Sequence, residues 1–330
     1  MTINGVAAEW DRAPAGLWAS DAAAADFIAY QQDYAYGEAL AERGVVIRRV
    51  RLFHVGICVG LAQVQIRRLF GAFTLGLIVR GPVWLDSTLS DGVKADCYDA
   101  LHATAPLEGL SGLIILPESD DAAAAAGAGM QRIMGGYHTV LWDLRPDEDA
   151  LRQGLAGKWR NRLVAAEKAG LTVTPISKSP DKYAWLLNEE AQQQRTVGYR
   201  AMPLDLTPAF HRHAGKGAVI ALQAKQNAET VGAMLFLRHG PCATYHIGWA
   251  NEAGKQLNVH NLLLWRAVAM LKKAGVEIVD LGGVNTDFNP GIARFKIGVG
   301  GAVTSLCGAW SRGPRWRARR SPKSLHPVAA

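Results

Sequence analysis

The alternation of apolar and polar residues along the first half of the chain predicts helices and strands in a definite order. A helix is expected over residues 21–44, where aromatic residues recur at helical spacing before Gly44. A strand hairpin should follow, since His54-Val55-Gly56 offers a turn between two apolar runs. The two strands of the hairpin are expected over residues 45–53 and 57–69, and a third strand over residues 72–79. A second helix is expected over residues 91–105, and two further strands over residues 110–116 and 137–144.

The second half of the chain repeats this order. Residues 147–169 are expected to form one amphipathic helix, because apolar residues recur at every fourth position from Leu151 to Leu163 and Gly170 suits the helix end. A strand over residues 171–176 and a helix over residues 182–194 follow, and then a hairpin over residues 218–224 and 230–239. The last elements are a strand over residues 242–249, a helix over residues 256–274 and a buried strand over residues 276–281. An internal repeat of a whole supersecondary unit indicates two modules of one architecture.

Helix, hairpin, strand, helix, strand is also the order of the acyltransferase fold that binds coenzyme A. In that fold the strand before the last helix splays away from its neighbour, and the acyl donor lies in the gap. We therefore expect an α/β protein of two acyl-CoA N-acyltransferase-like modules in tandem, each a mixed, largely antiparallel sheet flanked by helices. The expected boundaries are 1–144 and 145–310, with the C-terminal tail at 311–330 packing on the first module.

The glycine-rich segment over residues 281–301 carries the strongest chemical signal in the sequence. It follows a buried strand and holds six glycines, which permit positive φ angles and close approach of the backbone to a ligand. Lys296 lies between Phe295 and Ile297 in this segment, which we expect to be a loop. A lysine flanked by apolar residues is either snorkelling or placed to meet a charge. The alternative is a glycine-rich hairpin with an exposed lysine, and we favour the ligand site.

One stretch matches the letters of the coenzyme A pyrophosphate loop, R-x-x-G-x-G, from Arg212 to Gly217. That loop should join the splayed strand to the following helix, where main-chain N–H groups hold the phosphates. Here it precedes the hairpin, and the correct junction, residues 251–258, has a single glycine, Gly254. We therefore interpret the match as chance, which argues against ordinary coenzyme A binding in the second module.

Other site types find little support in the sequence. No zinc-protease motif, hydrolase elbow or cysteine-nucleophile motif occurs, so we expect no metal, no resident cofactor and no covalent nucleophile. No window approaches the ~20 apolar residues of a membrane span, and the acidic N-terminus does not resemble a signal peptide. We expect a cytoplasmic protein with free, buried thiols at Cys58, Cys97, Cys242 and Cys307.

The formal charge of +7 is concentrated near the C-terminus, where six cations lie between Arg312 and Lys323. A solvated tail explains such a run, and so does an electrostatic arm for a polyanion such as RNA or for an anionic membrane face. A second group of cations, from Lys158 to Lys168, is either a solvated helix face or a contact for an anionic substrate through Arg160 and Asn161.

Several motifs, in order, resemble the Fem family, the peptidoglycan-bridge aminoacyltransferases. They are Gly60-Leu-Ala-Gln-Val, Arg80-Gly-Pro-Val-Trp84, Trp142-Asp-Leu, Lys158-Trp-Arg160-Asn161-Arg162, Asn261-Leu-Leu-Leu-Trp265, Asp280-Leu-Gly282-Gly283, Pro290-Gly291-Ile and Phe295-Lys296-Ile-Gly298. The resemblance covers most of the chain and is strongest over residues 140–301. It is to the compact form, since the long coiled-coil insertion of some members is missing.

The resemblance implies two modules facing one cleft, an aminoacyl-tRNA donor and an amine acceptor on a peptidoglycan precursor or similar peptide. It also allows a peripheral contact with the inner membrane face. It links Phe295 and Lys296 to the aminoacyl end of the tRNA and to the developing oxyanion. The substrate-binding candidates are Arg160, Asn161, Asn261, Gly282, Gly283 and Arg80, and the tRNA-binding candidates are Arg312, Arg315 and Arg317.

The chemistry of such a transfer fits the residues. An ester carbonyl attacked by an amine develops negative charge on oxygen, and a fixed ammonium such as Lys296 stabilises it. Asp143, Asp280 or Asp287 could accept the proton of the amine, and the sequence does not rank them. Two alternatives stay open. One is an acyl-CoA-dependent N-acyltransferase acting on a small amine or secondary-metabolite intermediate, and the other is a non-catalytic scaffold associated with RNA or a membrane.

Overall fold

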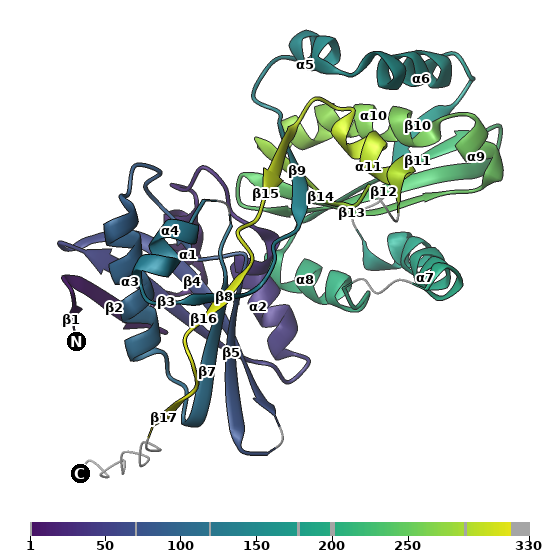
Figure 1. Cartoon of the computed structure of the whole chain (residues 1–330). Helices are drawn as coiled ribbons and strands as arrows, with labels where there is room; N and C mark the ends of the chain where they lie inside the picture. Colours follow the sequence, from purple (N-terminus) through teal and green to yellow (C-terminus); the bar gives the residue numbers. More distant parts are fainter. Residues whose placement is uncertain are drawn as a thin grey trace, which may run out of the picture.

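The computed structural model describes residues 2–69, 71–118, 120–176, 179–198, 202–286 and 289–317. These residues form two mixed sheets flanked by helices, which lie side by side (Figure 1). Asp287 and most of the basic tail, residues 318–330, lie outside the described residues. Within them, none of the helices has the length and apolar character to cross a membrane.

The first sheet is a continuous sheet with parallel strands at its centre. Its main path follows β1 (Thr2–Ile3), β2 (Val6–Trp10), β3 (Val46–His54), β4 (Ile57–Leu69), β5 (Phe73–Val79), β7 (Gly109–Leu116), β16 (Ala309–Ser311) and β8 (Gln131–Met134). The short strands β6 (Val83–Trp84) and β17 (Arg315–Arg317) pair with β4 and β7. The parallel strands β5 and β7 pair along their whole length, from Phe73↔Leu110 to Val79↔Leu116, so this sheet has no gap at its centre.

The second sheet carries the β11–β12 hairpin. Its order is β10 (Thr172–Pro175), β11 (Val219–Gln226), β12 (Glu229–His239), β13 (Cys242–Ala250), β14 (Ile278–Val284), β9 (His138–Asp143) and β15 (Ala302–Ser305). Its strands are apolar on both faces: in β12, Met234 and Phe236 enter one core while Leu235 and Leu237 enter the other. Side chains alternate along a strand, so a run that is apolar throughout predicts helices on both faces.

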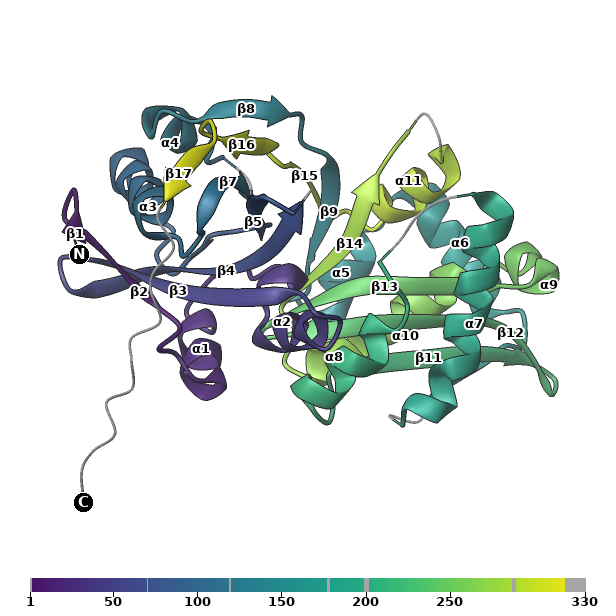
Figure 2. The same ribbon diagram turned by 90° about the horizontal axis from the view of Figure 1, so that it is seen from below.

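Helices cover both sheets. In the second module α5 (Glu148–Gly154), α6 (Gly157–Glu167) and α10 (Val259–Lys273) pack on one face, and α7 (Pro180–Val197) and α8 (Leu206–Ala214) on the other. In the first module α3 (Asp91–Thr104) and α4 (Ala122–Gly127) share a core with the sheet. The helices α1 (Ala15–Ala22) and α2 (Tyr34–Ala41) pack against residues of the second module. We call this contact region between the two modules the seam; there α2 lies beside α8 (Figure 2).

Two parallel strands of the second sheet splay apart. β13 and β14 pair only from Cys242↔Ile278 to Thr244↔Asp280. Beyond that point β13 continues along β12 as far as Ala250, whereas β14 continues along β9 as far as Val284. A gap therefore opens between the C-terminal halves of β13 and β14, as the acyltransferase-like order of elements predicts for a donor site. The first module has no such gap.

The module boundary differs from the expected one at residue 144. β9 (His138–Asp143) lies in the second sheet, between β14 and β15, so the boundary falls in the connection after β8. The chain then returns, because β16 and β17 pair with β7 of the first sheet. The apolar pattern predicts a strand over residues 137–144, but such a strand fits either core and only its partners decide which.

Two expected helices are interrupted. Residues 21–44 hold the last two residues of α1, a 3₁₀ turn (Tyr30–Gln32) and α2; the buried Gln32 side chain donates to the Val79 carbonyl, and Asp33 caps α2 by accepting from Ala35 N. Residues 147–169 split at Ala156, whose N–H donates to the Gly298 carbonyl at 2.9 Å instead of continuing a helix. At Ala156 a main-chain bond to a distant segment replaces a helical hydrogen bond, and at Gln32 a side-chain bond to a distant strand holds the interruption.

Candidate active site

The glycine-rich segment after β14 contains a helix that the sequence pattern did not predict. α11 (Pro290–Ile297) begins at Pro290, a residue that suits the first turn of a helix because it lacks the N–H that would have no partner there. Lys296 lies in its last turn and donates from Nζ to the Gly283 carbonyl of β14 at 2.9 Å. The Lys296 ammonium is thus fixed at the C-terminal end of β14, on one side of the gap.

A turn in β14 presents that carbonyl. Gly282 has φ of +76°, which a side chain would strain, and its N–H donates to Asp280 Oδ1 at 2.8 Å. The pairing of β14 with β9 shifts register between Asp280 and Gly283. A Cβ on Gly282 would lie 3.4 Å from Lys296 Nζ. The two consecutive glycines therefore shape the strand end on which the ammonium rests.

Burial changes the acid–base behaviour of Lys296. Loss of hydration lowers the pKa of the ammonium to about 8, with the charge of Asp280 acting in the opposite direction. At pH 7 the charged form still prevails by roughly ten to one. The side chain can therefore act as a fixed cation at neutral pH, and it loses that charge in the mildly alkaline range.

Phe295 anchors α11 on the other side. Its ring stacks on Trp159 of α6, with centroids 6.0 Å apart, and contacts His260 of α10 at 6.1 Å. Trp159 Nε1 also donates to the Phe295 carbonyl at 3.0 Å. A Cβ on Gly298 would lie 2.7 Å from the Trp159 ring, so the glycine permits this approach. Lys296 and Phe295 thus hold α11 against two different elements, β14 and α6.

Asp280 is buried beneath the site, and both of its carboxylate oxygens have bonding partners. Its Oδ1 accepts from Thr139 Oγ1 at 2.6 Å and from Gly282 N, and its Oδ2 pairs with Arg80 of the first module. Burial by itself would raise the pKa of Asp280, but the Arg80 guanidinium and these hydrogen bonds lower it overall. A carboxylate with a lowered pKa is a poor proton acceptor, so its geometry favours a structural role over that of general base.

Arg80 lies in the seam between the modules instead of on an open, substrate-facing surface. Only 5% of its surface is exposed, and its guanidinium pairs with Glu118 as well as with Asp280. Burial would lower the pKa of Arg80, but the two carboxylates raise it overall, so the guanidinium remains charged. Both charges of the Arg80–Asp280 pair are buried, and removal of either would leave the other without compensation.

The remaining predicted residues are dispersed. Arg160 and Asn161 are exposed on α6, next to the buried Trp159. Asn261 is buried on α10, and its Nδ2 has no hydrogen-bond partner within the described part of the chain. Asp143 is exposed at the end of β9 and pairs with Arg145, whose hydrogen bonds lower the pKa of its carboxyl group. Asp287, the third candidate base, lies outside the described residues.

The tRNA-binding candidates lie on the first module. Arg312 pairs with Asp99 and donates to the Ala128 carbonyl, so its charge is partly used within the module. Arg315 and Arg317 belong to β17, where their main chains pair with Ser111 and Gly109. The other cations of the basic tail fall outside the described residues.

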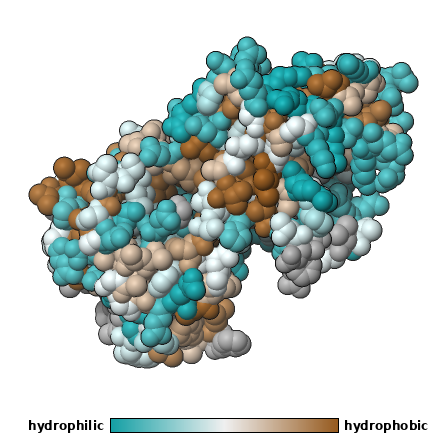
Figure 3. Space-filling view, turned by 45° about the horizontal axis from the view of Figure 1, so that its top comes forward, coloured by the Kyte–Doolittle hydropathy of each residue, from teal (hydrophilic) through white to brown (hydrophobic). Residues whose placement is uncertain are grey.

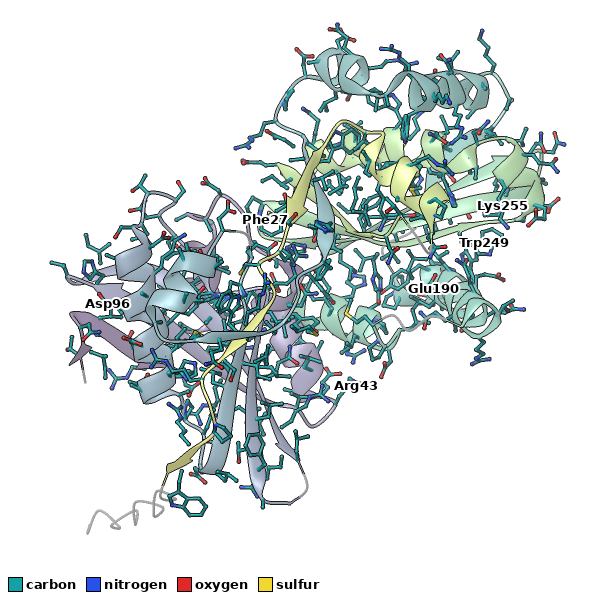
Figure 4. All side chains as sticks on the ribbon, in the orientation of Figure 1. Phe27, Arg43, Asp96, Glu190, Trp249 and Lys255 are labelled. Carbon is teal, nitrogen blue, oxygen red and sulfur yellow. The ribbon has the colours of Figure 1, made fainter. Side chains whose placement is uncertain are left out.

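A cavity that sequence reasoning missed lies at the seam. It has a volume of about 460 Å³ and is lined by residues of α2, β4 and the start of α8, including Tyr36, Arg43, Gln65, Arg67 and Leu206. Figure 4 marks Arg43 at this seam. Arg67 is exposed, and Arg43 pairs with Asp205. Because these side chains come from separate elements, no local motif could have identified the cavity.

The junction after β13 has no open phosphate loop. Asn251 Oδ1 accepts from Gly254 N at 2.8 Å, capping α9 (Glu252–Gln256), and Gly254 packs against the Val231 carbonyl. The R-x-x-G-x-G match lies at the end of α8, where Arg212 and His213 both pair with Glu42. This placement agrees with the interpretation that the match is chance. The described residues contain no cluster of His, Cys, Asp and Glu suited to a metal.

Apolar surface adjoins the site. Ile292 and Ile297 of α11 and Val303 of β15 are exposed, with Ile297 next to Lys296 in sequence. The space-filling view shows an apolar area near the middle of the molecule, between its two halves (Figure 3). A substrate that reaches Lys296 over this face would therefore meet both apolar surface and a cation.

Comparisons with known proteins identify the class of fold. Residues 155–296 match the family model of the acetyltransferase (GNAT) domain. The crystal structure of FemX is similar with a TM-score of 0.75 and 14% identity, over 92% of this chain and 96% of that chain. No curated protein matches the sequence.

Two further solved structures are similar. A tandem GNAT protein from the clavulanic acid biosynthesis pathway has a TM-score of 0.51 and 17% identity, over 93% and 98% of the two chains. The C-terminal domain of a putative lysylphosphatidylglycerol synthetase from Agrobacterium fabrum has a TM-score of 0.50 and 13% identity, over 89% and 91%. The predicted fold class, two acyltransferase-like modules in tandem, is therefore confirmed, as is the resemblance of the chain to the Fem type.

Proposed function

We propose that the chain is an aminoacyltransferase that moves an aminoacyl group from aminoacyl-tRNA to an amine of a peptidoglycan precursor or similar peptide. The observation that carries the proposal is the position of Lys296, whose Nζ lies 2.9 Å from the Gly283 carbonyl beside the gap between β13 and β14. In acyltransferase folds the acyl group of the donor lies in this gap. An ammonium fixed there meets the charge that develops on the carbonyl oxygen.

The transfer forms an amide and breaks an ester. The nitrogen of the acceptor amine bonds to the carbonyl carbon, and the ester bond to the terminal ribose oxygen then breaks. Lys296, protonated at pH 7, stabilises the oxyanion between these steps, an effect of about 3–4 kcal/mol for one well-placed donor. The proton lost by the amine ends on the leaving ribose hydroxyl, so the bonds and protons balance between donor and acceptor alone.

The seam cavity is the proposed binding place of the acceptor. A volume of about 460 Å³ accommodates part of a peptide or nucleotide-sized molecule, and the exposed Arg67 in its lining favours an anionic acceptor, whereas Arg43 is paired with Asp205. Peptidoglycan precursors carry carboxylates and phosphates. The lining of the cavity includes Val79, which directly precedes Arg80 and its bond to Asp280. The acceptor would thus bind along the seam that supports β14.

The junction after β13 favours tRNA over coenzyme A as the donor. Coenzyme A needs free main-chain N–H groups for its pyrophosphate at that junction. Here the Gly254 N–H is already bonded to Asn251, and a Cβ on Gly254 would collide with the Val231 carbonyl. The acetyltransferase (GNAT) match over residues 155–296 favours the alternative, an acyl-CoA-dependent N-acyltransferase acting on a small amine.

The test incubates the protein with a mixture of charged tRNAs and candidate acceptors and measures the added mass on each acceptor by mass spectrometry. We expect an aminoacyl increment with charged tRNA and none with acetyl-CoA. The Lys296→Ala variant should lose at least 100-fold in rate, whereas Lys273→Ala, at the exposed end of α10, should match the wild type. An acetyl increment without an aminoacyl increment would replace the proposal by its alternative.

A further inference from the structure

Two consecutive residues of α11 bridge the gap between β13 and β14. Lys296 donates to Gly283 on β14, while the Phe295 ring contacts His260, which follows β13 through α9. Lys296 therefore lies on the β14 side of the gap, and the ring of its neighbour Phe295 contacts His260 at the start of α10. Figure 4 marks Trp249 of β13 and Lys255 of α9 near α11, at this end of the second sheet.

His260 lies in the first turn of α10 with one ring nitrogen unsatisfied. The main chain of Trp249 raises the pKa of the ring, while its Nε2 is buried and has no hydrogen-bond partner among the residues that the structure describes. A buried polar atom without a partner costs about 1–3 kcal/mol, so proteins retain few of them. The neighbouring Asn261 Nδ2 is also buried without a partner. The unpartnered Nε2 of His260 lies on a ring that contacts Phe295, so a polar group that reaches this ring would complete its bonding.

The main chain of Trp249 indicates the tautomer of His260. It raises the pKa of the imidazole, as expected when the ring donates to a main-chain carbonyl, and Nδ1 is the nitrogen available for it. We therefore assign the proton of the neutral ring to Nδ1, which leaves a free lone pair on Nε2. Burial, assisted by the charge of Lys255, lowers the pKa of His260 overall, so the ring is neutral at pH 7.

We propose that His260 is the general base of the transfer, with Nε2 accepting the proton of the acceptor amine as its nitrogen bonds to the donor carbonyl carbon. This role rests on the proposed function. The proton then passes from Nε2 to the ribose oxygen as the ester bond breaks, which returns the imidazole to its neutral form. Lys296 keeps its own proton and stabilises the oxyanion from the β14 side of the gap.

The carboxylates that the sequence offered as bases are less suitable. Asp280 has its oxygens bonded to Arg80, Thr139 and Gly282, and the pKa of its carboxyl group is lowered. Asp143 is exposed and paired with Arg145. His260 combines a free lone pair with a position against Phe295, which neither described carboxylate has.

The charged groups on the elements around His260 support the neutral imidazole. Lys255 of α9, which pairs with Glu252, lowers the pKa of His260, and α11 adds the cations of Arg294 and Lys296. Lys158 and Arg160 flank Trp159 on α6, whereas His246 of β13 bonds to Thr207 of α8, on the other face of the sheet. Cations thus outnumber carboxylates here, which keeps the ring deprotonated down to mildly acidic pH.

The experiment compares the pH dependence of kcat/KM for wild type, His260→Gln and His54→Gln, in the aminoacyl-transfer assay. The wild type should show an acid limb below pH 6.5, where His260 protonates, and an alkaline limb near pH 8 from Lys296. A glutamine amide can still donate to Trp249 but cannot exchange a proton. We therefore expect His260→Gln to lose 100-fold or more in kcat, with little change in KM, and to lack the acid limb.

The control and a second readout separate the outcomes. His54 lies at the β3–β4 turn of the first module, so His54→Gln should keep the full wild-type profile. A His260→Gln enzyme within threefold of wild type, with its acid limb intact, overturns the role of His260 and leaves the function standing. A wild type without transfer from any charged tRNA overturns both. Nitrogen-15 NMR of histidine-labelled wild type should show a neutral Nδ1–H ring for His260 at pH 7, and an Nε2–H ring would also refute the role.

Discussion

The buried ion pair between Arg80 and Asp280 ties the seam of the molecule to its candidate active site. Arg80 is 5% exposed and Asp280 only 1%, so replacement of Arg80 by methionine would leave a carboxylate uncompensated in the interior. Breaking a buried pair in this way costs about 3–5 kcal/mol. Total stabilities are about 5–15 kcal/mol, so we expect Arg80→Met to fold but to unfold at clearly lower urea concentration.

The pH dependence of this loss has a defined sign. In the wild type the folded-state pKa of Asp280 is lowered, so the contribution of Asp280 to stability is present above its unfolded pKa and is lost as pH falls through the folded value. Without Arg80, burial dominates and raises the pKa of Asp280. The variant should therefore be destabilised more at pH 7 than at pH 4.5, because ionisation of the buried carboxyl becomes unfavourable.

Urea unfolding followed by tryptophan fluorescence at the two pH values measures this effect, with Arg80→Met/Asp280→Asn as the matched variant. An asparagine oxygen can still accept from Thr139 and Gly282, and no charge remains to be paired, so the double variant should regain at least half of the loss. A loss below about 1 kcal/mol, an equal loss at both pH values or no recovery in the double variant would refute the reasoning. The charge of Asp280 raises the pKa of Lys296. If the double variant is active, the alkaline limb of its pH–rate profile, which comes from Lys296, should therefore lie at lower pH than in the wild type.

Three further predictions concern the site, the cavity and the tail. Gly298→Ala should destabilise the protein by about 1–3 kcal/mol in urea unfolding and slow transfer, since a Cβ there lies 2.7 Å from the Trp159 ring, whereas Gly291→Ala has open space and should be neutral. Arg67→Ala should raise the KM of an anionic acceptor about tenfold in transfer assays, because one charged hydrogen bond is lost. Arg68→Ala, outside the cavity lining, should leave the KM unchanged, and equal KM values for the two variants would contradict an acceptor site in the cavity. Truncation after residue 317 removes three cations, so tRNA binding measured at increasing salt should show a shallower dependence, and an unchanged slope would separate the tail from tRNA.

Much of the fold follows from local patterns in the sequence. Both hairpins, β3–β4 and β11–β12, were predicted to within a few residues, because period-two alternation and turn residues are properties of short segments. The repeated order of elements predicted two acyltransferase-like modules, which the comparisons confirm. The same repeat could not assign β9 to the second sheet, since an apolar strand suits either core.

The candidate site, too, was predicted only in part from the sequence. The glycine-rich segment with Phe295 and Lys296 was identified from composition, but the sequence suggested a loop where α11 forms, since its glycines lower helix propensity and only packing against Trp159 and Gly283 compensates. His260 gave no signal at all, as a single histidine at the start of a helix is unremarkable until its surroundings are known.

The sequence by itself thus determined the order of the elements, the acyltransferase-like architecture and the segment that holds Lys296, because each depends on neighbours along the chain. Only the tertiary structure decided how the modules meet and which groups surround the gap. Arg80 and Asp280 are 200 positions apart, and the two segments that flank α11 come from different parts of the second module. Such pairings depend on the packing of whole elements, for which no local periodicity carries information.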